Sequence, residues 1–120
     1  MPVAATDILV VLTNLPDRAA AVKLAQTLVE RRLAACVNIL GEASSVYRWQ
    51  GGIETASEVP VLIKTRSGLY PEVEATISEA HPYELPEIIA VPVVLGLPAY
   101  LDWVTAETSV AGGQQPVGAG

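Results

Sequence analysis

Apolar residues along the chain form two kinds of pattern, unbroken runs and helical repeats. The unbroken runs are rich in β-branched residues, which is typical of strands with both faces buried: ILVVL from Ile8, LAACVNIL from Leu33, VPVLIKT within residues 53–66, and EIIAVPVVL from Glu87. Apolar positions recur at helical spacing in residues 18–33 and 66–82, and residues 97–108 read as a third helix. The predicted order is βαββαβ plus a C-terminal helix, an α+β fold of the ferredoxin-like, split βαβ type.

Local signals set several boundaries of these elements. Asp17 is expected to cap the first helix, and His81 to end the second, because a residue before proline is disfavoured in helical geometry. The turn QGGIE predicts a hairpin with long arms, in which Gly51 and Gly52 supply positive φ angles. Pro60 lies inside the third apolar run and donates no ladder hydrogen bond, so we expect it at a bulge or an unpaired edge.

The strands carry more apolar surface than the predicted helices can cover. Hydrophobic residues make up 51% of the chain, and the mean hydropathy is +0.40. Helices of this fold cover one sheet face, yet all four runs are apolar on both faces. Each Å² of apolar surface left exposed forgoes about 25 cal/mol of burial. We therefore expect copies of the same chain to cover the second face by symmetric packing.

Length and charge restrict the class of protein. The 120 residues fit one domain, which we assign to residues 1–108, with a flexible tail over residues 109–120, whose sequence SVAGGQQPVGAG has no core-forming pattern. A net charge of −6 argues against nucleic acid or an anionic membrane as partner. No apolar run is long enough for a membrane span, and the N-terminus lacks the basic start of a secretory signal. A cytoplasmic location is the expectation.

Five stretches in order carry a resemblance to a known family: VLTNLPDRAAAVKLAQTLVERRLAACVNI, SVYRWQGGIE, SEVPVLIKT, HPYELPEI and YLDWV. Together they resemble the CutA family of divalent-cation tolerance proteins, from about Ile8 to Thr108. The resemblance implies a ferredoxin-like fold in a tight homotrimer, whose long hairpin arms reach neighbouring subunits, an architecture similar to the PII signalling proteins. It also implies a link to copper or another divalent cation as the ligand. Pro60 departs from the aliphatic residue usual in the family.

The candidate metal ligands are His81, Cys36 and Glu84. His81 is the only histidine and is followed by Glu84 and Glu87, so an imidazole with one or two carboxylates is one interpretation. The other is a helix end where a partial positive charge suits the helix dipole. Cys36, the only cysteine, is either a small core residue or a thiolate ligand suited to copper(I). Transition metals normally take three or four ligands, so a tight site needs donors from another subunit.

A second candidate site is a cleft between subunits. Aromatic side chains of the family motifs either pack the hairpin against a neighbour or line an amphipathic pocket. Glu58 and Lys64 are six residues apart on one predicted strand face, so they either form a rim ion pair or belong to an anion-binding cleft. The full candidate set is Tyr47, Trp49, Glu58, Lys64, Thr65, Tyr83, Glu87 and Trp103.

The sequence contains no nucleophile-elbow, Walker or dinucleotide-binding motif, and we expect no enzyme. The favoured function is a cytoplasmic homotrimer that binds a divalent metal, with copper first. The alternatives are a PII-like sensor or adaptor that binds a small anion in its clefts, and an interaction scaffold without a ligand.

Overall fold

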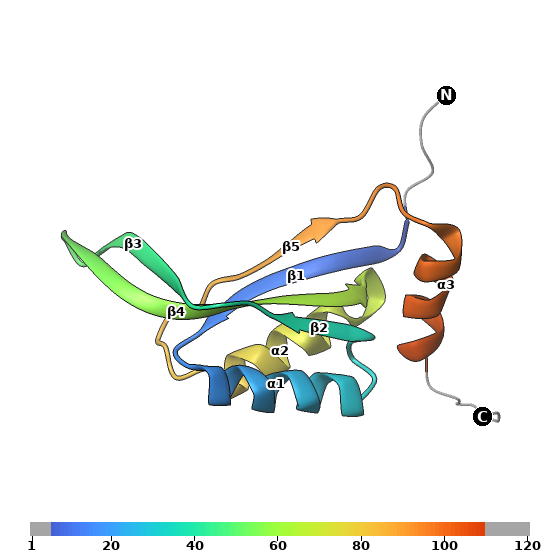
Figure 1. Cartoon of the computed structure of the whole chain (residues 1–120), viewed down its shortest axis with the longest axis horizontal. Coiled ribbons are helices and arrows are strands. Elements are labelled where there is room, and N and C mark those ends of the chain that lie inside the picture. The colour runs from blue at the N-terminus through green and yellow to red at the C-terminus, as the bar shows by residue number, and fades with distance from the viewer. Residues whose placement is uncertain (1–5, 110–120) are drawn as a thin grey trace.

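The computed structural model describes residues 6–109, in which an antiparallel sheet packs against helices (Figure 1). Its elements in chain order are β1 (Ile8–Leu15), α1 (Arg18–Glu30), β2 (Cys36–Ile39), β3 (Ala43–Trp49), β4 (Gly52–Arg66), a 3₁₀ turn (Ser67–Leu69), α2 (Tyr70–Ala80), β5 (Ile88–Pro92) and α3 (Pro98–Glu107). The predicted α+β class is confirmed, and so is the alternation of strands and helices, but the predicted second strand is divided into β2 and β3, so the sheet has five strands instead of four. The predicted tail lies outside the described residues beyond Ser109.

The sheet has the strand order β2-β4-β1-β5, and every neighbouring pair is antiparallel. β3 pairs only with the outer half of β4, so these two strands form an arm that extends beyond the body of the molecule (Figure 1). α1 and α2 cover one face of the sheet. α3 stands at the end of the sheet remote from the arm (Figure 1).

The two faces of the sheet differ in burial. On the helix-covered face Val11, Val61 and Ile63 are fully buried and form the core with the apolar sides of α1 and α2. We call the opposite side the open face: its apolar residues are Val10, Leu12, Leu62, Ile89 and Val91, aligned by the strand register. The first three are half-buried, and Ile89 and Val91 are 50% and 49% exposed. The strands are apolar on both faces, as expected, but one chain buries only one of them.

The helix boundaries follow local chemistry. The Asp17 carboxylate accepts a hydrogen bond from the Ala20 amide at 2.8 Å, which confirms the predicted cap. α1 ends earlier than predicted because Arg32 takes a positive φ of 56°, and the next amides bond back to Leu28. His81 ends α2 as predicted, with φ −87° and ψ 133°.

The hairpin turn is shifted by one residue from its predicted place. Gln50 and Gly51 have positive φ angles of 49° and 83°, whereas Gly52 already belongs to β4. The prediction of a positive φ at Gly52 was therefore wrong. A two-residue turn of this kind needs positive φ at both central positions, and the strand register assigns these to residues 50 and 51.

Pro60 lies at a bulge, as predicted. β2 ends its pairing at Val61, and β3 begins its pairing at Glu58, so residues 40–42 lie opposite Val59 and Pro60. Three residues facing two is a bulge on the β2–β3 side. The Pro60 carbonyl accepts a hydrogen bond from the Leu40 amide at 3.0 Å. In an antiparallel strand the amide and the carbonyl of one residue point toward the same neighbouring strand. The nitrogen of Pro60, which has no hydrogen to donate, therefore points toward the bulge and not toward a regularly paired residue.

Among residues 6–109, no helix combines the length and the apolar character needed to cross a membrane.

Candidate functional site

A hollow of about 750 Å³ lies between the β3–β4 arm and the segment that follows α2. The arm contributes aromatic, small and charged side chains, the segment contributes Tyr83 and two glutamates, and the end of β1 contributes an asparagine. Its lining residues are Asn14, Ser45, Val46, Tyr47, Arg48, Trp49, Ala56, Glu58, Tyr83, Glu84, Leu85 and Glu87. We call this space the arm hollow.

Three contacts of His81 and Asn14 hold the segment 83–87 against the sheet. His81 Nε2 lies 2.5 Å from the backbone oxygen of Asn14, and His81 Nδ1 accepts the Tyr83 amide at 3.2 Å. The Asn14 side-chain amide donates to Glu87 Oε1 at 3.0 Å. The position of one wall of the arm hollow is thus set by the end of β1.

The electrostatics of the arm hollow centre on Glu58 and Tyr83. Glu58 lines the hollow, yet only 8% of the residue is exposed. Partial burial and the neighbouring Glu58 carboxylate raise the pKa of Tyr83 above its usual value of 10. The Tyr83 ring also packs on His81, with ring centres 4.5 Å apart. Tyr83 is therefore a neutral phenol at physiological pH.

Five of the eight predicted cleft residues meet in the arm hollow: Tyr47, Trp49, Glu58, Tyr83 and Glu87. Glu84, predicted as a metal ligand, joins them. Sequence reasoning missed Asn14 and Arg48. The position of Asn14 at the end of a predicted strand, beside the segment after α2, was a usable signal.

The three other predicted cleft residues lie elsewhere. The Thr65 side chain is buried and donates to the Leu33 carbonyl at 2.7 Å. Lys64 Nζ donates to the Asn38 side chain. Trp103 packs on Tyr100 within α3, with ring centres 5.6 Å apart.

The rim ion pair between Glu58 and Lys64, one of the two interpretations of these residues, is not formed. The one ion pair among residues 6–109 joins Arg32 to Glu107. Glu58 and Lys64 share a side of β4, because its pairing with β1 runs without a break. Six residues of strand separate them by about 20 Å, however, which is too far for contact.

Cys36 lies on β2 opposite Lys64, so it belongs to the open face. It is half-buried, and its Sγ is 4.0 Å from Asn38 Oδ1. Partial burial, and to a lesser degree the nearby Cys36, raise the pKa of Tyr100 on α3. Cys36 is thus at the α3 end of the sheet, and the arm hollow is at the other.

Within one chain the candidate metal ligands do not form a cluster. Residues 6–109 bring no three His, Cys, Asp or Glu side chains close enough together to hold a metal ion. Both ring nitrogens of His81 are engaged by backbone groups. A metal at His81 would have to displace one of these contacts.

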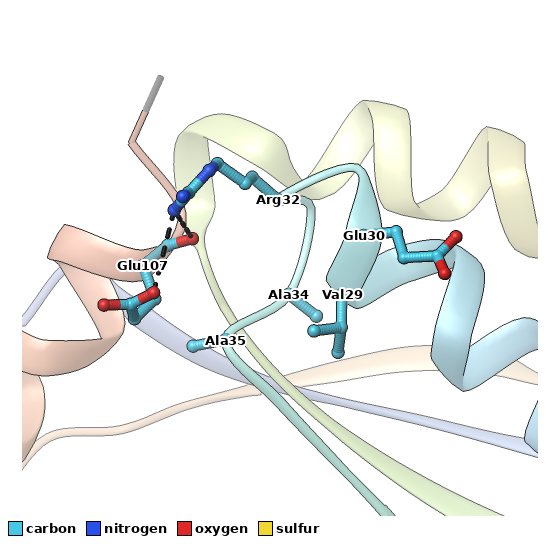
Figure 2. A pocket seen from close by; sticks show the side chains of 6 residues that line it. All are labelled: Val29, Glu30, Arg32, Ala34, Ala35 and Glu107. Atoms are coloured by element: carbon cyan, nitrogen blue, oxygen red, sulfur yellow. Dashed lines mark hydrogen bonds and ion pairs between the residues drawn. The ribbon is translucent and has the colours of Figure 1, made fainter. Parts of the chain in front are cut away.

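A smaller hollow of about 160 Å³ lies between the α1–β2 connection and α3 (Figure 2). Arg32 reaches across it to Glu107, donating to the backbone oxygen at 3.2 Å and pairing with the carboxylate at 3.6 Å. Its lining contains no further polar group besides Glu30, and its contacts hold the end of α3 in place.

The family model described as CutA1 divalent ion tolerance protein matches residues 9–107. The chain belongs to the CutA1 family. The resemblance noted from the five sequence stretches is thereby confirmed, and divalent-cation tolerance is the function attached to the family.

Individual CutA relatives agree with this assignment. The divalent-cation tolerance protein CutA of Thermus thermophilus is 42% identical over 99 residues, which are 82% of this chain and 96% of the relative. Protein CutA of Mus musculus is 47% identical over 89 residues, or 74% of this chain. The match spans about half of the mouse protein's length, 50%.

A solved structure confirms the fold. The crystal structure of CutA from Xylella fastidiosa superposes with a TM-score of 0.84 at 43% identity, covering 87% of this chain and all of that one, 100%. The antiparallel sheet with its three helices is therefore the CutA1 fold.

Proposed function

We propose that this CutA1 chain is a cytoplasmic homotrimer that binds divalent cations, with copper as the first candidate, and that it catalyses no reaction. The family supports the general role in divalent-cation tolerance. The trimer, the choice of copper and the cellular location are our proposals.

The open face is the observation that carries the trimer proposal. Five apolar side chains line up across β4, β1 and β5 on this face, and α1 and α2 lie on the opposite one. Contiguous apolar surface of this kind is typical of a protein interface. Packing of identical chains would cover it without any other partner.

The metal proposal depends on this assembly. One chain offers His81, Cys36 and Glu84 at separate places, and no three candidate donors converge within residues 6–109. Donors from neighbouring subunits would complete a site. Cys36 is half-buried on the open face, where it would approach another copy, and a thiolate suits copper(I).

Mass measurement tests the assembly. Light scattering at micromolar concentration should give the mass of three chains, and Ile89→Lys should lower it, because the variant places a charge in the packed face. Val29→Lys is the matched control, since Val29 is 43% exposed on α1, away from the open face. A wild-type monomer would contradict the proposal.

Copper titration tests the ligand. Calorimetry of the wild type with copper(II), and with copper(I) under reducing conditions, should show binding that weakens about tenfold or more when a donor is lost. Cys36→Ser, His81→Ala and Glu84→Gln test the three candidates. Equal copper affinity in all four proteins would mean incidental binding to surface carboxylates.

The alternative of a small-anion sensor is weakened by the arm hollow. Glu58, Glu84 and Glu87 line it, against Arg48 as the one cationic side chain in the lining. Lys64, the residue expected to bind an anion, donates to Asn38 and lies outside the hollow.

A further inference from the structure

We draw no further inference here: the strongest candidate, the exposed apolar surface of the edge strand β5 and of the connection from β5 to α3 (Ile89, Val91, Val94, Leu95 and Leu97), belongs in part to the open face already proposed to pack against identical chains, and nothing in the structure shows what covers the remainder.

Discussion

The His81 side chain joins the end of α2 to the end of β1 through Asn14, a residue 67 positions earlier in the chain. Its Nε2 faces the Asn14 carbonyl, and its Nδ1 accepts the amide of Tyr83. The ring thus bridges two backbone groups while only 8% of the residue is exposed. The single histidine has a structural role in this chain, in addition to any role in metal binding.

Removal of this bridge should destabilise the fold. His81→Ala leaves the Asn14 carbonyl and the Tyr83 amide without their partner, and we expect a loss of about 1–3 kcal/mol in the free energy of unfolding. Urea unfolding measures it. Glu79→Ala, an exposed change near the end of α2, is the control and should have a much smaller effect. Equal stability of His81→Ala and wild type would contradict the structural role.

Features determined by nearby residues were predictable from the sequence. Asp17 as a cap and His81 as a helix end depend on chemistry within a few residues, and both were correct. The hairpin turn was misplaced by one residue because two glycines favoured residues 51 and 52. The strand register selects Gln50 instead, and register depends on pairing along the whole arm.

The candidate site was also predictable only in part, and again the part that depends on strand register was missed. Residues of the arm and of the segment after α2 line one hollow within a single chain. The cleft between subunits, to which the motifs assigned them, stays a prediction. The ion pair between Glu58 and Lys64 does not form, because two side chains on the same face of a strand point the same way but can lie too far apart for contact. The partner of Lys64 is Asn38, on the adjacent strand β2, and its position follows from the sheet register.

Two buried threonines in the sheet should respond in opposite ways to replacement by valine. Thr13 Oγ1 is buried and has no hydrogen-bond partner among the described residues, so Thr13→Val should stabilise the protein by about 1 kcal/mol. Thr65 donates to the Leu33 carbonyl at 2.7 Å, so Thr65→Val should cost about 1–2 kcal/mol. Paired chemical denaturation curves measure the contrast. Destabilisation by both variants would show that Thr13 has a partner, such as a bound water.

The arm turn offers a stabilising change. Gln50 has φ 49°, a conformation that a side chain other than glycine, asparagine or aspartate adopts at a cost. Gln50→Asn should raise the free energy of unfolding by about 0.5 kcal/mol, since asparagine–glycine is the favoured pair for this turn. Gly51→Ala, at φ 83°, should lower it. Thermal melting of the two variants gives the order, and a reversed order would contradict the assigned turn.

Two arginines hold the end of α3, and we expect their contributions to the free energy of unfolding to differ. Arg66 donates to the Thr108 hydroxyl at 2.8 Å and to its carbonyl at 3.0 Å, in a half-buried setting. Arg66→Met should cost about 1–3 kcal/mol. Arg32 and Glu107 are each 48% exposed (Figure 2), so Arg32→Met should cost under about 1 kcal/mol. Hydrogen exchange in α3 should rise more in the Arg66 variant, and equal effects would contradict this ranking.

Three tyrosines should make the protein sensitive to alkali. Burial raises the pKa of Tyr70, Tyr83 and Tyr100 above 10, and Glu74, Glu58 and Cys36 respectively add to the shift. Below about pH 10 these groups are protonated in both the folded and the unfolded chain, so they add no pH dependence. Above pH 10 the tyrosines of the unfolded chain lose their protons first, and stability falls as the pH rises toward the pKa values of the folded state.

Melting temperatures from pH 8.5 to pH 11.5, a range of about 1.5 units on either side of 10, should show this decline. Tyr83→Phe should decline less steeply than wild type, because it lacks the phenol beside Glu58. An unchanged slope in that variant would mean that burial and Glu58 do not raise the pKa of Tyr83 in solution.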